Sequence, residues 1–266
     1  MATSFQGKTI WITGASAGIG ESLAYAFAKH NVKLILSARR KDELERVAAH
    51  CRELGSESYI YPFDLSVPSQ NEAVSDEVLK KFKYIDILIN NGGMSQRSLV
   101  AETPVEVDRH LMEVDFFSNV ILTKKVLPSM VQRQSGHIVV ISSVTGIFGF
   151  PLRSAYSAAK HALQGFYETL WAELHHQGIN VTIAYPGRIR TNVSINALTN
   201  TGEPYGIMDH GQDKGLSADK CALKIVNAIK HKKIAVYIAG KELVLIYLKR
   251  YIPYFFFKLV TKVTPT

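Results

Sequence analysis

The sequence predicts one α/β domain built on a doubly wound parallel sheet of about seven strands. Short apolar runs alternate with helical stretches along most of the 266 residues, which is typical of parallel strands joined by crossover helices. A glycine-rich turn follows the first apolar run. No linker or internal repeat divides the chain, so a single domain over 1–266 accounts for its length.

Each predicted strand is an apolar run bounded by polar or turn residues, as in KTIWIT and VKLILSA. The runs cover 8–13, 32–38, 57–63, 84–90, 137–142, 180–185 and 233–238. The predicted helices cover 19–30, 42–54, 68–82, 105–130, 154–177 and 217–230. The helix over 105–130 is long, and we expect it to bend or break before Pro128. Ligands of such a sheet bind at the carboxyl ends of its strands, so the loops there are the candidate site.

Hydrophobic residues make up 47% of the chain and charged residues 20%, as in ordinary globular proteins. The net charge of +8 favours anionic partners, but the basic residues form no motif that reads nucleic acid. Cys51 and Cys221 have neither a disulfide framework nor metal-ligand spacing, and we expect no metal. The N-terminus, MATSFQGKTIWITG, lacks the apolar run of a signal peptide, which predicts a cytoplasmic protein.

The turn at 13–20, TGASAGIG, lies between a predicted strand and a predicted helix. Glycines in that position let the backbone turn tightly and approach a pyrophosphate, which the positive end of the helix attracts. The candidate dinucleotide-binding residues of this turn are Gly14, Ser16, Gly18, Ile19 and Gly20.

Basic residues stand where NAD-binding folds place an acidic residue, directly after the second strand. The sequence there is Ser37-Ala38-Arg39-Arg40. An arginine fork suits a 2′-phosphate and no carboxylate repels it, so NADP(H) is the preferred cofactor and NAD(H) the alternative. The competing interpretation is that Arg39 and Arg40 are solvated charges at the start of a helix.

Ser143, Tyr156 and Lys160 fall within the stretch 141–160. Tyr156 and Lys160 are four residues apart and share a face of the predicted helix. The pKa of a tyrosine is about 10 and an ammonium one turn away lowers it, so the pair can exchange a proton near neutral pH. Ser143 follows a predicted strand and could hold a substrate oxygen beside the phenol. Such a site moves a proton on or off an alcohol or a carbonyl.

These motifs resemble the short-chain dehydrogenase/reductase family over nearly the whole chain. The turn at 13–20 fits its TGxxxGxG motif, and Ser143, Tyr156 and Lys160 match its catalytic serine and YxxxK. The segment at 90–93 resembles its NNAG motif, with glycine where alanine is usual. The resemblance implies cofactor contacts from Asp64, Leu65, Asn91, Gly92, Gly93, Tyr156, Lys160, Pro186, Gly187, Ile189 and Thr191.

The resemblance also implies roles. Tyr156 would give a proton to the carbonyl oxygen or take one from the alcohol, Lys160 would bind the nicotinamide ribose, and Ser143 would orient the substrate oxygen. The family's fourth catalytic residue is an asparagine, but the aligned position here is Asp115, and Asn119 lies one turn later. An ionised carboxylate accepts but does not donate. Asp115 could still hold a relay water near Lys160, and it would also stabilise the charge of Lys160 and weaken its effect on Tyr156.

Two further segments are candidates for substrate or partner contacts. The loop 192–216 contains four glycines, as a lid over the site would, although an inert surface loop fits nearly as well. The tail 241–266 mixes aromatic residues with cations and is interrupted too early for a spanning helix. It fits an interfacial segment on anionic lipid, or a segment packed on the core or on a partner subunit.

The leading hypothesis is an NADP(H)-dependent oxidoreductase of carbonyls or secondary alcohols, with a hydrophobic, lipid- or steroid-like substrate. The segment RSAYSAAKHALQGF resembles the hydroxysteroid and acyl-ketone reductase branch of the family. A homodimer or homotetramer is expected. The alternative is an NADP(H)-binding regulator with little turnover, which the change to Asp115 would allow.

Overall fold

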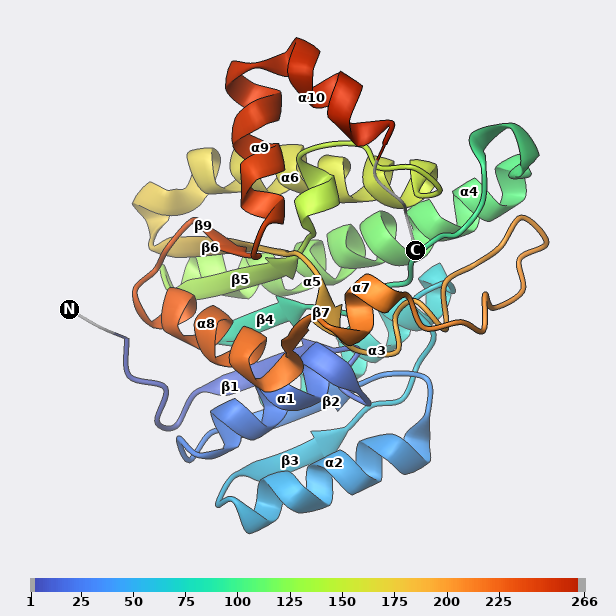
Figure 1. The fold of residues 1–266 in the computed structure, drawn as a ribbon. Coiled ribbons are helices and arrows are strands. Elements are labelled where there is room, and N and C mark those ends of the chain that lie inside the picture. The colour runs from blue at the N-terminus through green and yellow to red at the C-terminus, as the bar shows by residue number, and fades with distance from the viewer. Residues whose placement is uncertain (1–2, 263–266) are drawn as a thin grey trace.

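The computed structural model describes residues 3–262, and the predicted domain extends beyond them by 1–2 and 263–266. Seven parallel strands form one sheet in the order β3-β2-β1-β4-β5-β6-β9 (Figure 1). They are β1 (Thr9–Thr13), β2 (Lys33–Ser37), β3 (Glu57–Ile60), β4 (Ile87–Asn90), β5 (Gly136–Ile141), β6 (Ile179–Pro186) and β9 (Ala235–Ile238). The chain order reverses between β1 and β4, which is where doubly wound sheets bind nucleotides. The predicted fold is confirmed.

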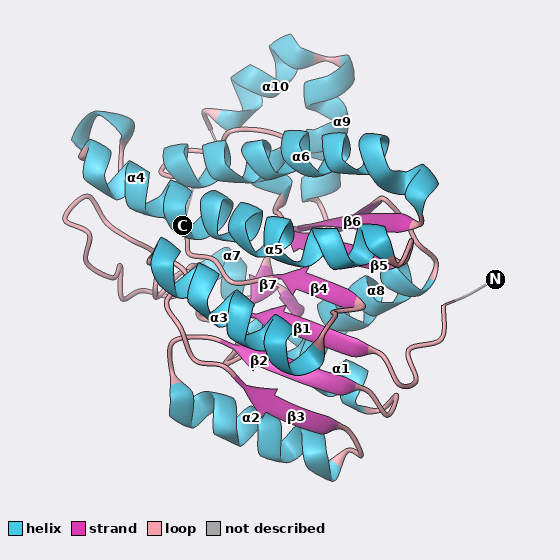
Figure 2. Ribbon diagram, turned by 180° about the vertical axis from the view of Figure 1, so that it is seen from behind, coloured by secondary structure: helices cyan, strands magenta, loops and turns pink. Residues whose placement is uncertain are grey.

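Helices cover both faces of the sheet, as Figures 1 and 2 show from opposite sides. One face carries α1 (Gly18–Ala28), α2 (Lys41–Glu53) and α8 (Ala218–Lys230). The other carries α3 (Pro68–Phe82), α5 (Ser118–Gln132) and α6 (Ser154–Leu174). Side chains alternate along each strand, so Ile10 and Ile12 join the core under the first face and Trp11 joins the core under the second. Burial on both faces explains why the strands are continuous apolar runs.

The helix predicted over 105–130 consists of three pieces. α4 (Val105–Met112) is followed by a π-helical turn, Glu113–Phe117, and then by α5. Pro128 lies inside α5 and does not end it. The interruption therefore falls at the turn that contains Asp115, and π turns of this kind occur often at functional sites.

Several predicted elements are shorter than expected, among them β3, β4, β9 and the helix that carries Tyr156. β3 ends at Ile60, although Tyr61 and Phe63 still donate backbone hydrogen bonds to the chain of β2 and its extension. The helix predicted over 154–177 ends as α6 at Leu174 and continues as the 3-10 turn His175–Gln177. Gly178 follows at a φ of 78°, a left-handed conformation that ends the helical segment.

The loop after β6 contains β7 (Ile189–Arg190), α7 (His210–Asp213) and β8 (Leu216–Ser217), of which β7 and β8 pair. The tail forms α9 (Glu242–Tyr251) and α10 (Pro253–Val260), which stand above the sheet and its helices in Figure 1. Its predicted end, 263–266, lies outside the described residues. Over residues 3–262, no helix has the length and apolar character needed to cross a bilayer.

The two cysteines are buried and unpaired. Burial raises the pKa of both the Cys51 and the Cys221 thiol to about 12, so neither is a reactive thiolate near neutral pH. Among the described residues, no group of histidine, cysteine and acidic side chains could hold a metal ion.

Candidate active site

The glycine-rich turn joins β1 to α1 at the carboxyl edge of the sheet. Gly14 and Gly18 have φ values of 63° and 58°, in the left-handed region that favours glycine. A Cβ atom on Gly20 would lie 2.2 Å from the Gly14 carbonyl oxygen. The turn thus depends on its glycines, and it leads directly into the amino end of α1, where backbone N–H groups attract anions.

A second turn, after β4, packs against the first. The Thr13 hydroxyl oxygen accepts hydrogen bonds from the N–H groups of Asn91 and Gly92, each at 3.0 Å. The Asn91 side chain donates to the carbonyl oxygens of Thr13 at 2.9 Å and of Gly14 at 3.3 Å. These bonds fix the two strand ends that flank the switch point relative to one another.

The glycines of this second turn are explained by their neighbours. A Cβ atom on Gly92 would lie 2.3 Å from Leu65 Cδ1, the flexible end of a side chain, so the family's usual alanine needs only a shift of that leucine. A Cβ atom on Gly93 would lie 2.7 Å from Asp115 Oδ1 and 3.3 Å from Lys160 Nζ. The chain after β4 therefore passes directly over the pair of Asp115 and Lys160.

The residues that follow β2 and β3 meet beside the glycine-rich turn. Arg40 donates to the Ser16 hydroxyl at 3.4 Å. The guanidinium of Arg39 lies 3.9 Å from the Asp64 carboxylate, and the Arg39 side chain is 67% exposed. An exposed pair at that distance contributes little to stability, so Arg39 is held only loosely.

Ser143 begins a 3-10 turn directly after β5. Its hydroxyl oxygen accepts hydrogen bonds from the Thr145 N–H at 3.2 Å and the Thr145 hydroxyl at 3.0 Å, and it donates to the Pro186 carbonyl at 3.5 Å. The neighbouring Ser142 donates to the Lys160 carbonyl at 3.2 Å. The turn that bears Ser143 is thus fixed to α6 at the level of Lys160.

Tyr156 and Lys160 lie one turn apart on α6, and Lys160 Nζ is 5.5 Å from the centroid of the Tyr156 ring. Lys160 is buried and donates to the Ile141 carbonyl at 3.3 Å. Asp115 Oδ2 lies 3.5 Å from Lys160 Nζ, and Asp115 Oδ1 accepts a hydrogen bond from the Met94 N–H at 2.8 Å. Tyrosine, lysine and aspartate thus form one cluster beneath the turn after β4.

Asp115 is fully buried. Burial raises the pKa of the Asp115 carboxyl, and the ammonium of Lys160 and the Met94 N–H oppose that rise. Asn119 does not take its place, because the Asn119 side chain donates to the Asp115 backbone carbonyl at 2.7 Å, within the helix. The structure therefore places Asp115, and not Asn119, against Lys160.

The segment after β6 reaches both ends of the site. A Cβ atom on Gly18 would lie 3.0 Å from Thr191 Cγ2, so Thr191 packs against the glycine-rich turn. The Pro186 carbonyl accepts the hydrogen bond of the serine described above. Gly187 and the buried Ile189 connect these two contacts along the chain.

Gln96 caps the first turn of α6. Its side-chain oxygen accepts hydrogen bonds from the N–H groups of Ala155 at 2.9 Å and Tyr156 at 3.4 Å. Its amide nitrogen donates to the hydroxyls of Ser98 at 3.1 Å and of Ser154 at 3.3 Å. Gln96 is completely buried, so it fixes the backbone that carries Tyr156.

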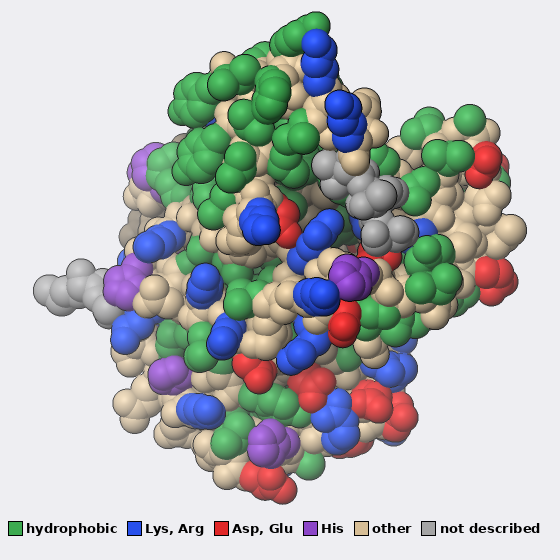
Figure 3. Space-filling model, in the orientation of Figure 1, with side chains coloured by type: hydrophobic (Ala, Val, Ile, Leu, Met, Phe, Trp, Pro, Cys, Tyr) green, Lys and Arg blue, Asp and Glu red, His purple; other side chains and the backbone are tan. Residues whose placement is uncertain are grey.

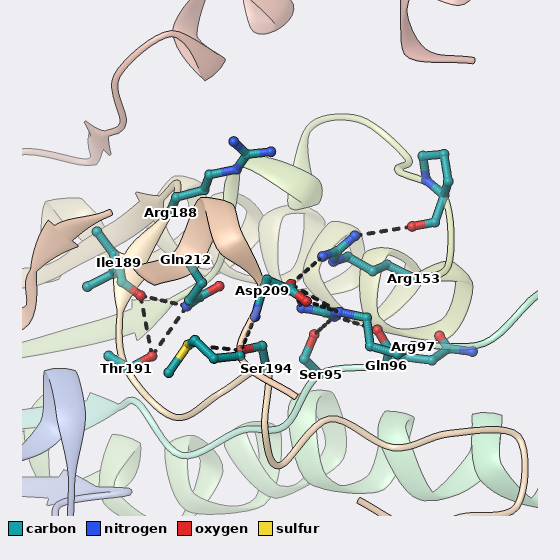
Figure 4. Close-up of polar contacts among 12 residues, drawn as sticks. Ser95, Gln96, Arg97, Arg153, Arg188, Ile189, Thr191, Ser194, Asp209 and Gln212 are labelled. Atoms are coloured by element: carbon teal, nitrogen blue, oxygen red, sulfur yellow. Dashed lines mark hydrogen bonds and ion pairs between the residues drawn. The ribbon is translucent and has the colours of Figure 1, made fainter. Parts of the chain in front are cut away.

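A buried ionic cluster lies beside Gln96 (Figure 4). Arg97 donates to the Asp209 carboxylate through Nη2 at 2.5 Å and Nε at 3.2 Å, and Arg153 donates to it at 3.1 Å. Asp209 belongs to the loop predicted as a lid, and its N–H donates to the Ser194 hydroxyl at 3.2 Å. The loop is therefore anchored to the segment after β4 and to the start of α6.

Three contributors have no counterpart among the predicted site residues: Thr13, Gln96 and the cluster around Asp209. Thr13 opens the glycine motif, so a hydroxyl at the end of β1 was a detectable signal. Gln96 and Arg97 have no local signal, because their partners lie far along the chain. The predicted site residues, by contrast, lie at the carboxyl end of a strand, in a segment that follows a strand, or on a helix at the same edge of the sheet.

The model of the short chain dehydrogenase family matches residues 8–201. The chain therefore belongs to the short-chain dehydrogenase/reductase family, and it is an oxidoreductase that acts on CH–OH and C=O groups. A nicotinamide cofactor is typical of this family. The family predicted from the motifs is confirmed.

The chain is similar to members of this family from animals. It is 44% identical over 261 residues to the dehydrogenase/reductase SDR family protein 7-like of Drosophila melanogaster, covering 96% of this chain and 80% of that protein. It is 40% identical over 257 residues to SDR family member 7B of Mus musculus, covering 94% and 79%. It is 40% identical over 252 residues to SDR family member 7 of Homo sapiens, covering 92% and 74%.

Solved structures share the fold. A short-chain dehydrogenase/reductase from Burkholderia phymatum in complex with NAD has a TM-score of 0.84 at 23% identity, covering 99% of this chain and 98% of that one. An alcohol dehydrogenase from Thermococcus sibiricus complexed with 5-hydroxy-NADP has a TM-score of 0.75 at 25% identity, covering 88% and 96%. Structural neighbours thus include complexes with both kinds of nicotinamide cofactor.

Proposed function

We propose that this protein is an NADP(H)-dependent oxidoreductase that transfers a hydride between the nicotinamide and a hydrophobic carbonyl or secondary alcohol. The observation that carries the proposal is the cluster on α6. Tyr156 stands one turn from a buried Lys160, and the turn of Ser143 is bonded to the backbone of that lysine. These groups lie at the sheet edge that also holds the glycine-rich turn.

The side chains of this cluster have separate tasks in the proposal. Tyr156 gives a proton to the substrate oxygen during reduction and takes it back during oxidation. Lys160 attracts the negative charge that develops on the tyrosine oxygen, since its ammonium is 5.5 Å from the ring centroid. Ser143 orients the substrate oxygen, and its own position is fixed by Thr145 and Pro186.

The residues present fit a dinucleotide. The glycine-rich turn has no side chains where its backbone must turn sharply, and α1 presents its amino end there. Gly14, Gly18 and Gly20 would approach the pyrophosphate, Asp64 and Leu65 the adenine side, and Asn91 to Gly93 with Thr191 the nicotinamide side. When bound, the nicotinamide supplies or accepts the hydride, and the protein supplies position and charge.

Two arginines support the preference for NADP(H). Arg39 is largely exposed and loosely paired, and Arg40 reaches the Ser16 hydroxyl at the glycine-rich turn. The side chain of Ser37, at the end of β2, is buried and accepts a hydrogen bond from the Trp11 ring at 3.0 Å. A 2′-phosphate at this corner would meet two guanidinium groups and no carboxylate from the end of β2.

An apolar cluster supports the hydrophobic substrate of the steroid- or acyl-ketone-reducing branch. Val107, Leu111 and Ala155 are buried together, with Met94 and Leu198 packed against them. Ala155 precedes Tyr156, and Leu198 belongs to the loop 192–216, which we propose is the lid over the substrate. The cytoplasmic location and the homodimer or homotetramer stay predictions.

The Tyr156→Phe variant tests the chemistry. It removes the hydroxyl that transfers the proton and keeps the ring, so we expect turnover to fall about a hundredfold or more while NADPH binds as before. Turnover is followed by nicotinamide absorbance, and binding by NADPH fluorescence. Tyr237→Phe, on β9, is the matched control and should change neither. Full activity in Tyr156→Phe would remove the assignment.

The Arg39→Ala/Arg40→Ala variant tests the cofactor preference. Loss of charge-assisted bonds to a 2′-phosphate should raise the KM for NADPH at least about tenfold and leave that for NADH unchanged. Arg52→Ala, near the far end of the helix that follows these arginines, is the control, since its guanidinium donates to the Ser58 carbonyl. Equal losses with both cofactors would contradict a 2′-phosphate site.

One observation favours a second function, an NADP(H)-binding regulator with little turnover. The Asp115 carboxylate lies 3.5 Å from Lys160 Nζ. It partly neutralises the ammonium charge that would assist Tyr156. Aldehydes, ketones and alcohols screened with NADPH and NADH in parallel separate the two functions. Turnover of any of them supports the enzyme, and tight NADPH binding without turnover supports the regulator.

A further inference from the structure

The two C-terminal helices are apolar on two opposite sides. Their inner side packs on the domain: Phe256 is buried, and its ring centroid lies 5.5 Å from that of the buried Phe148. Leu245, Ile246, Leu248 and Val260 complete this inner contact. Packing on the core was one of the alternatives predicted for the tail. Only one side of the two helices packs in this way.

The outer side carries large apolar side chains that are exposed to solvent. On α9 they recur at i, i+3 and i+7, which places them on one face of the helix. On α10 they surround the buried Phe256 on either side. The exposed set, which we call the aromatic face, is Val244, Tyr247, Tyr251, Ile252, Tyr254, Phe255 and Phe257. Figure 3 shows these helices as a dense apolar patch on top of the molecule.

Cations border the aromatic face. Between 241 and 262 the exposed cations are Lys241, Arg250, Lys258 and Lys262, while Lys249 turns inward, and the single acidic residue is Glu242. Lys258 lies over the Tyr254 ring, 4.5 Å from its centroid. Tyrosines and phenylalanines beside lysine and arginine match the composition of segments that lie in the headgroup region of a bilayer.

We propose that the aromatic face of α9 and α10 docks on the surface of a bilayer that contains acidic lipids. The aromatic rings enter the headgroup boundary, and the bordering cations neutralise acidic headgroups. The chain as a whole has a net charge of +8, which attracts it to such a surface before contact. The helices are too short to span, so the contact is peripheral. This docking does not depend on the proposed catalytic function.

Charge argues against a second copy of the chain as the occupant. A two-fold interface brings each patch against its own copy. Four exposed cations and one acid would then face the same set across a desolvated contact, with few partners of opposite sign. An acidic lipid surface supplies the opposite sign without that conflict.

The docking surface is joined to the active site. Lys249 on α9 donates to the Ile147 carbonyl, and Phe148 packs on α10 through Phe256. Both contacted residues belong to the segment that leads from Ser143 to the helix of Tyr156. A protein docked in this way holds its substrate-binding edge close to the bilayer, where hydrophobic carbonyls and alcohols concentrate.

Vesicle flotation of the full chain tests the proposal. We expect the protein to float with vesicles of phosphatidylcholine and phosphatidylserine, and much less with phosphatidylcholine alone. The variant Tyr251→Ser/Tyr254→Ser/Phe255→Ser should lose binding about tenfold, and so should Lys241→Glu/Arg250→Glu/Lys258→Glu. All six positions are exposed, so the fold should survive, which the melting temperature and NADPH binding check.

Matched controls lie on α8, away from the two helices. Leu223→Ser removes an exposed leucine there, and Lys220→Glu/Lys224→Glu/Lys230→Glu makes the same charge change per residue. Both controls should float like the unchanged protein. Equal flotation of the aromatic-face variants and the controls would overturn the proposal. So would a dimer that dissociates in the aromatic variant while no form floats, since the face would then join two copies of the chain.

Discussion

Asp115 distinguishes this site at the scale of single residues. A carboxylate at the position of the family's asparagine is completely buried, accepts the Met94 N–H and lies 3.5 Å from Lys160 Nζ. Two charges of opposite sign at this depth each pay for desolvation, and each relies on the other. The Asp115 carboxylate therefore stabilises the ammonium of Lys160. It also weakens the electrostatic attraction of that ammonium for negative charge on the Tyr156 oxygen.

Asp115→Asn tests this balance. The amide keeps the shape and can still accept the Met94 N–H, so we expect activity to be kept or raised. Without the carboxylate, the ammonium of Lys160 keeps its full attraction for negative charge on the Tyr156 oxygen. The measurement is kcat and kcat/KM with NADPH, with Asp108→Asn on α4 as the control for loss of a partly buried carboxyl. A hundredfold loss of activity would mean that the carboxylate has a task of its own.

At the scale of elements, α6 is positioned from its first turn. The helix has no serine, threonine or aspartate cap of its own, and Arg153 before it forms no side-chain cap. Gln96, from the segment after β4, supplies the acceptor for two of its first N–H groups. Through Arg97 and Asp209 the same segment holds the loop 192–216. The cap of α6, the anchoring of the loop 192–216 and the position of Tyr156 therefore all depend on the short segment after β4.

Gln96→Ala should lower kcat about tenfold, because the first turn of α6 loses its acceptor and Tyr156 is less well positioned. NADPH binding should change much less than kcat, since the hydrogen bonds of Gln96 reach neither the glycine-rich turn nor Asn91 to Gly93. Ser56→Ala is the control: it removes a buried hydroxyl bonded to the backbone of Val32 and Ala28 at the opposite edge of the sheet. It should cost comparable stability and leave kcat intact. Matching losses of kcat in both variants would show a general loss of stability instead.

The elements that sequence predicts best are those specified locally. The central strands β1, β4 and β5 follow from apolar runs that are buried along their whole length, and the site motifs follow from glycines and spacing. The π turn at Asp115 has no such marker in LMEVDFF, because contacts from Met94 and Lys160 accompany it. Gln96 shows the same limit, since its role exists only once α6 lies beside it. Which side of α9 and α10 is buried and which is exposed depends likewise on how the two helices pack against Phe148.

At the scale of the whole molecule, the two edges of the sheet carry different groups. The carboxyl edge holds the glycines, the buried ion pairs and the cluster around Tyr156. At the amino edge, His137 at the start of β5 is buried and shares a hydrogen bond of 2.8 Å with the Thr182 hydroxyl. That hydroxyl donates to the Lys233 carbonyl, so the imidazole Nε2–H is the donor to Thr182.

His137 makes stability depend on pH. Burial lowers the pKa of the His137 imidazole to about 3, from an unfolded value of about 6.5. The unfolded chain therefore takes up a proton below about pH 6.5 that the folded protein does not, so this stability is present above that pH and is lost as the pH falls toward 3. Between pH 7 and pH 5 the loss from this one group should be about 2 kcal/mol.

His137→Gln tests that dependence by urea unfolding at pH 7, 6 and 5. A glutamine amide can still donate to Thr182 but takes up no proton, so the free energy of unfolding of the variant should fall less over this range, by about 2 kcal/mol. The control is His176→Gln, which changes an exposed histidine after α6 and should follow the unchanged protein. Parallel curves for His137→Gln and the unchanged protein would mean that the buried imidazole does not set the acid limit of this fold.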